Sequence, residues 1–74
     1  MNSIRPDDYV VWKWAGGMGH GTVKSVHAER TEIESKGKHI VRNGSHDNPA
    51  VIIEDHNGTK VLKLASELNS TEKD

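Results

Sequence analysis

The dipeptide Asn57-Gly58 constrains this chain more than any other feature, because it separates two runs rich in β-branched and aliphatic residues. This arrangement is the strongest short-range signal for a β-hairpin. A two-residue type I′ loop places both residues at positive φ and sets the register of the flanking strands. It predicts the cross-strand pairs His56 with Thr59, Asp55 with Lys60, Ile53 with Leu62, and Val51 with Leu64.

In this register one face of the hairpin is apolar. An isolated hairpin is only marginally stable in water, so its apolar face needs a partner sheet. We therefore expect a small closed or nearly closed β-structure. Its predicted interior is lined by Val10, Trp12, Ile53, Leu62 and Leu64.

The length and composition indicate one small domain. A chain of 74 residues buries only about 60% of its unfolded surface, and 32% hydrophobic residues with no Phe leave a thin core. There is no cysteine for disulfides or thiolate metal sites. With no apolar run long enough to cross a bilayer and no leader-like start, we expect a cytoplasmic monomer without a membrane partner.

Alternation within residues 9–14 predicts a first strand with Val10, Trp12 and Trp14 facing inward and Tyr9 on the opposite face. A glycine-rich turn follows at residues 15–21. The second strand, residues 22–27, carries Val23 and Val26 out of phase, which predicts a β-bulge.

Turn-forming residues divide the remainder of the chain. Strands at residues 31–35 and 39–42 flank Lys36-Gly37-Lys38 as a second hairpin, and residues 43–49 form a polar loop. A short helical turn at residues 65–68 is expected to be capped by Ser66. The predicted domain spans residues 9–68, after a polar lead-in at 1–8 and before a frayed tail at 69–74.

About five strands with a terminal helical turn suggest an all-β, SH3-like antiparallel barrel of the Tudor type. The chain also resembles the Tudor-like domain of hypervirulence-associated proteins. The resemblance rests on these segments, in order: 8–12 (DYVVW), 21–23 (GTV), 36–37 (KG), 48–54 (NPAVIIE), 57–58 (NG) and 61–68 (VLKLASEL). It implies a bent, barrel-like sheet with a binding role and no catalytic residues. The family pattern usually has Gly where this chain has Asp7.

Three patterns suggest chemistry, and each has a simpler interpretation. Gly17, Gly19 and Gly21 precede a strand rather than a helix, so we favour a flexible hairpin loop over a phosphate cradle. Three consecutive loop residues, Ser45-His46-Asp47, cannot converge as a hydrolytic triad. The five histidines lack the spacing typical of metal sites. We therefore expect a non-enzymatic protein without cofactor or metal, although a metal site assembled across strands stays open.

Two binding functions remain. The first is recognition of a protein or peptide by rim loops near residues 16–20 and 43–48, with Tyr9, His20, His46 and Asn48 as candidate ligand-binding residues. A cage for methylated lysine needs several aromatic residues; for Trp12 and Trp14 we favour core packing. The alternative is nucleic-acid binding, disfavoured by 10 basic against 11 acidic residues, through Lys13, Lys24, Lys36, Lys38 and Arg42.

Overall fold

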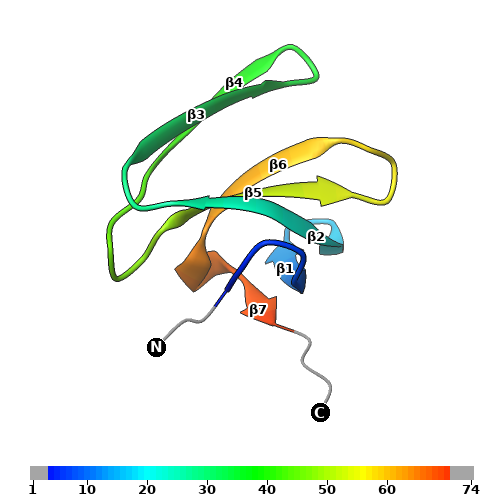
Figure 1. Ribbon diagram of the computed structural model, residues 1–74. Helices are drawn as coiled ribbons and strands as arrows, with labels where there is room; N and C mark the ends of the chain where they lie inside the picture. The colour runs from blue at the N-terminus through cyan, green and yellow to red at the C-terminus, as the bar shows by residue number, and fades with distance from the viewer. Residues whose placement is uncertain (1–3, 71–74) are drawn as a thin grey trace.

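The computed structural model describes residues 4–70, which form an all-β structure with one short helical turn (Figure 1). This confirms the predicted fold class. No helix in the described part of the chain is long and apolar enough to cross a membrane. In chain order the elements are β1 (Tyr9–Trp14), β2 (Gly17–His27), β3 (Arg30–Ser35), β4 (Lys38–Asn43), β5 (Ala50–Asp55), β6 (Lys60–Leu64), the 3₁₀ turn η1 (Ala65–Glu67) and β7 (Asn69–Ser70).

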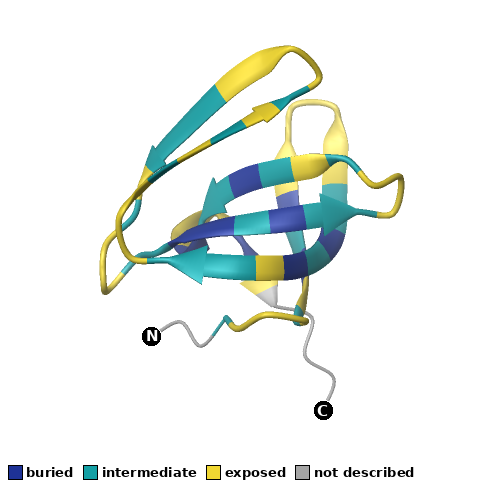
Figure 2. Ribbon diagram, turned by 45° about the horizontal axis from the view of Figure 1, so that its top comes forward, coloured by how far each residue is buried: buried dark blue, intermediate teal, exposed yellow. Residues whose placement is uncertain are grey.

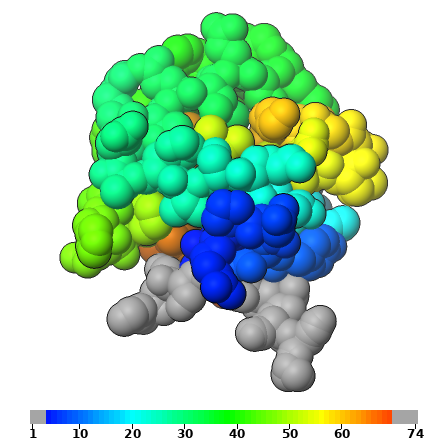
Figure 3. Space-filling view, in the orientation of Figure 1, coloured from blue at the N-terminus to red at the C-terminus, as the bar shows by residue number. Residues whose placement is uncertain are grey.

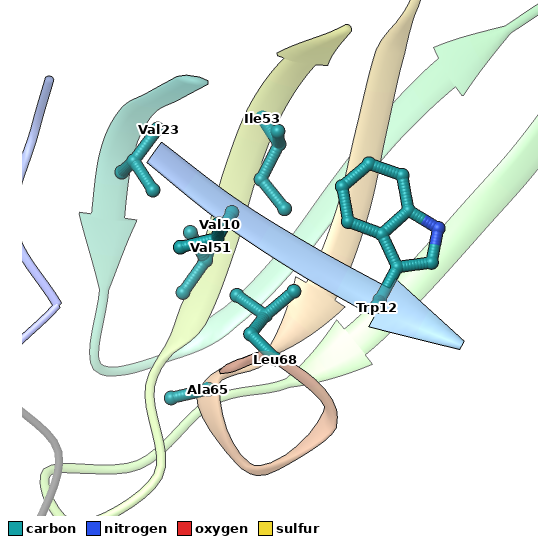
Figure 4. Packing of buried hydrophobic residues seen from close by; sticks show 7 residues of the cluster. All are labelled: Val10, Trp12, Val23, Val51, Ile53, Ala65 and Leu68. Carbon is teal, nitrogen blue, oxygen red and sulfur yellow. The ribbon is translucent and has the colours of Figure 1, made fainter. Parts of the chain in front are cut away.

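Five strands form one antiparallel sheet in the order β6-β5-β2-β1-β7, and β3 and β4 form a separate hairpin. The large sheet curls, because side chains of β1 pack against those of β5 although β2 lies between the two strands. Figure 4 shows β1 crossing over β5, with the core between them. The core cluster comprises Val10, Trp12, Val23, Val51, Ile53, Ala65 and Leu68. The fold is therefore barrel-like.

The predicted bulge in β2 is confirmed. The pairing of β2 with β5 shifts register between Val23 and Ser25. One extra residue in β2 reverses the alternation of its side chains. As a result Val23 is fully buried and Val26 also packs against the core.

The β5–β6 hairpin exists, but its predicted register is wrong by one residue. The observed pairs include Ile52 with Leu62 and Ile53 with Val61. The Gly58 N–H donates to the Asp55 carbonyl at 2.9 Å, and Gly58 has φ of +84°, whereas Asn57 is not at positive φ. Residues 56–58 therefore form a three-residue hairpin loop, in which a turn is followed by a bulge at Gly58.

This register places apolar side chains on both faces of the hairpin. Val51, Ile53 and Val61 contact the main core, and Ile52 and Leu62 point the other way. Leu62 is nonetheless only 1% exposed, because β3 and β4 pack against β6. Of the five predicted interior residues, Val10, Trp12, Ile53 and Leu62 are buried, and Leu64 is half-buried. Figure 2 shows, in dark blue, that buried residues lie in the middle of the strands of the curled sheet.

The β3–β4 hairpin forms as predicted. Its two loop residues, Lys36 and Gly37, have φ of 53° and 77°, so the type I′ turn lies here and not at Asn57-Gly58. Along β3 exposed and half-buried side chains alternate, as expected for a strand that covers a core on one face. In the space-filling view this hairpin forms the top of the molecule, with β2 running beneath it (Figure 3).

The glycine-rich segment was predicted to be a loop, and this is wrong for most of it. Residues 17–21 belong to β2 and pair with β1. The glycines are needed here because a Cβ on Gly19 would lie 2.4 Å from the Trp12 ring, and one on Gly21 would lie 2.6 Å from the Glu54 carbonyl oxygen. The inward placement of Trp14 is also wrong. Its ring lies over Gly16 at the end of the hairpin and is 55% exposed.

Both ends of the domain are tied to the sheet. Asp7 has φ of 79°, a conformation that Gly adopts freely and Asp tolerates, which explains why the family pattern has Gly there. Asn69 and Ser70 were predicted to be part of a frayed tail, but they form β7 against β1; residues 71–74 lie outside the described residues.

The helical turn η1 is not capped by Ser66 as predicted. Instead the Glu67 carboxylate accepts the Leu64 N–H at 2.7 Å. Burial raises the pKa of Glu67, but the Leu64 N–H and the Arg42 side chain outweigh this effect, so the pKa lies below its ordinary value. An ionised Glu67 therefore satisfies the backbone at the start of the turn.

The loop geometry predicts that substitutions at Gly58 and Asn57 change the stability of the protein by different amounts. Gly58→Val places a β-branched residue at positive φ and is expected to cost about 1–3 kcal/mol. Asn57→Ala is expected to change stability by less than about 0.5 kcal/mol, since Asn57 is not in that conformation. Urea unfolding followed by tryptophan fluorescence measures both. An equal loss of unfolding free energy in the two variants would instead support the two-residue type I′ loop.

Candidate functional site

A shallow hollow of about 270 Å³ lies at the end of the β1–β2 hairpin. β2 extends beyond β5 here, because β2 pairs with β5 only from Gly21 onward. Trp14 and Met18 stand 55% and 54% exposed beside the hollow. It is lined by Trp12, Trp14, Met18, Gly19, His20, Asp55 and His56. The site thus combines exposed apolar side chains with two imidazoles and one carboxylate.

Three rings form a row across the sheet on the face opposite to the core. The Tyr9 hydroxyl and Nδ1 of His20 are joined by a hydrogen bond of 2.7 Å. The His20 ring stacks on that of His56, with 5.3 Å between ring centres and 15° between planes. The register explains the row, since continuing the pairing of Gly21 with Asp55 puts His20 opposite His56. The predicted residues Tyr9 and His20 therefore lie together.

Asp55 supports both the hollow and the loop that ends β5. One carboxylate oxygen accepts the N–H groups of Asn57 and Thr59, each at 2.9 Å. The Thr59 N–H, aided by that of Asn57, holds the pKa of Asp55 below its ordinary value despite some desolvation. Asp55 therefore carries a negative charge at the hollow at neutral pH.

The other two predicted ligand-binding residues lie elsewhere. His46 and Asn48 are in the loop before β5, at the opposite end of that strand from the hollow (Figure 1). The Asn48 side chain accepts the Ser66 N–H at 2.8 Å and donates to the Ser66 hydroxyl at 3.1 Å, so it holds η1 in place. The His46 side chain is 98% exposed. The structure therefore does not bring the two rim loops together.

The five cations proposed for nucleic acid are distributed over two hairpins, β1–β2 and β3–β4, and two of them lie within 4 Å of acidic side chains in the described part of the chain. Lys24 lies 3.3 Å from Glu54, and Arg42 lies 3.2 Å from Glu67. Lys36 and Lys38 are at the tip of the β3–β4 hairpin, and Lys13 is exposed on β1. The structure therefore does not gather these cations into one basic stripe.

The patterns with apparent chemistry are not assembled into sites. Ser45, His46 and Asp47 are exposed, and the Ser45 hydroxyl accepts the Asn48 N–H at 3.1 Å. Within residues 4–70 no group of three or more His, Asp or Glu side chains is placed to hold a metal ion. Gly17 and Gly19 lie in a strand and so do not precede a helix that could hold a phosphate.

Residues 7–68 match the model of the family described as hypervirulence associated proteins TUDOR domain. The chain belongs to this family. The match covers nearly the whole domain and confirms the resemblance drawn from the sequence. No curated protein and no solved structure gives a significant match. Tudor-like domains are often binding modules, which makes the hollow the natural candidate for the binding site.

Of the seven residues that line the hollow, only His20 was among the predicted ligand-binding residues. Trp14 was not selected because period-2 alternation placed it inside, and Met18 lay within the proposed rim loop at residues 16–20 but was not singled out. His56 was not selected because the type I′ loop paired it with Thr59. The sequence did contain a signal for the position of Trp14. If the β-pattern of β1 and β2 is continued to their turn, Trp14 lies opposite Gly17 at the end of the hairpin.

The lowered pKa of Asp55 predicts a pH dependence of stability. Because the folded pKa is below the unfolded value of about 3.9, the stabilisation is present above pH of about 4 and is lost as pH falls through the folded pKa. We expect Asp55→Asn to be less stable than wild type at pH 7 and to lose less stability on acidification.

Melting temperatures measured by circular dichroism between neutral and acidic pH test this. Asp47→Asn is the matched control, since that carboxylate lies exposed in the loop before β5. Parallel pH profiles for Asp55→Asn and wild type would show that the turn does not depend on the Asp55 charge.

Proposed function

We propose that this protein is a non-enzymatic binding module that recognises a protein or peptide segment at the hollow of the β1–β2 hairpin. The observation that carries the proposal is the placement of exposed apolar residues. Within residues 4–70 the large hydrophobic side chains that stand exposed are Tyr9, Trp14 and Met18, and all three belong to this hairpin. Trp14 and Met18 line the hollow together, whereas Tyr9 lies at the other end of β1; exposed apolar side chains that lie together mark interaction surfaces.

The chemistry of the hollow suits a peptide. Trp and Met supply large apolar contact area, and Trp is enriched among residues that dominate binding energy. The imidazoles of His20 and His56 and the Asp55 carboxylate add polar groups that can orient a ligand. Trp12 and Trp14 both line the hollow, but Trp12 is 7% exposed and packs in the core, which argues against an aromatic cage.

The row of Tyr9, His20 and His56 favours a second candidate, single-stranded nucleic acid. Rings on a sheet surface can stack with bases, and Lys13 and Lys24 project from the same face of β1 and β2. Lys24 is already paired with Glu54, which weakens this candidate. Titration with a labelled single-stranded oligonucleotide at low and high salt tests it. Binding that falls steeply with salt supports this candidate, and no binding at low salt eliminates it.

The peptide proposal predicts the effect of truncating the exposed side chains. Peptides selected from a displayed random library by binding to the full chain serve as the probe. We expect Trp14→Ala and Met18→Ala each to weaken binding about tenfold, the change that 1.4 kcal/mol produces. Isothermal titration calorimetry measures the affinities. Stability is expected to change little, because neither side chain is in the core.

His46→Ala is the matched control, because it also removes an exposed ring but lies at the other end of β5. Its affinity for the selected peptides is expected to equal that of the wild type. Loss of binding in His46→Ala with none in Trp14→Ala would move the site to the loop before β5.

A further inference from the structure

An unpaired strand edge lies beside the hollow. Residues 17–20 of β2 pair with β1 on one side, while the pairing with β5 on the other side begins only at Gly21. No backbone hydrogen bond within residues 4–70 joins this segment, here called the β2 edge, to any element other than β1. The edge is about 13 Å long at the usual rise of a strand.

The direction of the backbone groups on this edge follows from a nearby contact. The Val23 N–H donates to the Asp8 carbonyl, and the Val23 carbonyl accepts the Asp7 N–H, each at 2.8 Å. The backbone N–H and carbonyl groups of odd-numbered residues in this part of β2 therefore face β1, and those of even-numbered residues face away from it. The N–H and carbonyl groups of Met18 and His20 thus point to the open side.

Proteins normally protect an exposed edge by charged residues, proline, a bulge or a covering element. The β2 edge, Gly-Met-Gly-His, contains no proline, Lys, Arg, Asp or Glu, and the bulge lies farther along, between Val23 and Ser25; only at its inner end does His56 lie opposite His20 among the described residues. Gly17 and Met18 are exposed, Met18 to 54%. The backbone is therefore accessible to a partner.

We propose that the β2 edge accepts an extended peptide segment as an added strand, with the segment's side chains alternating between the two faces of the sheet. This rests on the proposed function and specifies how the peptide binds. Backbone hydrogen bonds to Met18 and His20 give affinity without sequence preference. Side chains on one face contact Trp14, and those on the other contact the imidazoles of His20 and His56, which gives selectivity. An apolar residue of the segment matches the exposed Trp14 ring.

Amide hydrogen exchange of the full chain, with and without a peptide selected from a random displayed library, tests the proposal. On binding, the Met18 and His20 amides are expected to become protected, while the Gly17 and Gly19 amides, which already face β1, are expected to stay unchanged. Alternating protection of this kind is specific to an added strand.

Two variants complete the test. Met18→Pro removes an N–H that points to the open side and is expected to weaken binding about tenfold beyond the matched variant Met18→Ala. If Met18→Pro fails to fold, N-methylation of alternate residues in the peptide replaces it. In an added strand, every second peptide N–H points toward β2 and the others point away. N-methylation of the first set is expected to abolish binding, and N-methylation of the second set is expected to leave binding intact.

The remaining outcomes each overturn the proposal. Peptide binding that perturbs Trp14 without protecting Met18 and His20 refutes strand addition and leaves the proposed function standing. Selection of no peptide, or binding of single-stranded oligonucleotide only, refutes both. Protection of the same two amides without peptide, together with dimers in sedimentation, assigns the edge to a second copy of the chain.

Discussion

The close approach of β1, β2 and β5 at Gly21 is the contact on which the rest of the structure depends. Gly21 is buried between two strands, and a Cβ there would lie 2.6 Å from a backbone oxygen of β5, an atom that cannot move without shifting the strand. Without this glycine the sheet could not curl enough to bring Val10 of β1 against Val51 and Ile53 of β5. In a domain this small, that packing forms most of the core.

The sequence predicted the elements well and the register of one hairpin poorly, for a physical reason. Both hairpin loops that suit Asn-Gly place Gly at positive φ, so the dipeptide does not distinguish them. A one-residue slip normally moves apolar side chains into water. Here it does not, because Ile52 and Ile53 are adjacent and both faces of β5 are covered. The deciding interaction is the Asp55 carboxylate, which binds two N–H groups of the longer loop.

The candidate site was only partly predictable because it depends on distant segments. Tyr9 and His20 were selected as exposed polar or aromatic residues, and the pairing of β1 with β2 brings them together. Glycines usually signal a loop, but Gly19 and Gly21 lie in a strand, where the Trp12 ring and the backbone of β5 occupy the space that their side chains would need. Asn48 is a polar loop residue of the kind expected at a barrel rim, yet its side-chain amide makes two hydrogen bonds to Ser66.

The register that the sequence did not predict also creates the open edge. Because β5 ends at Asp55, the chain turns away just where β2 continues toward Gly17. A strand β5 that continued through His56, as a two-residue loop requires, would lie along His20 and cover part of this edge. The Asp55 carboxylate therefore links two properties of the domain: by stabilising the longer loop, it ends β5 early and leaves the backbone of Met18 and His20 accessible.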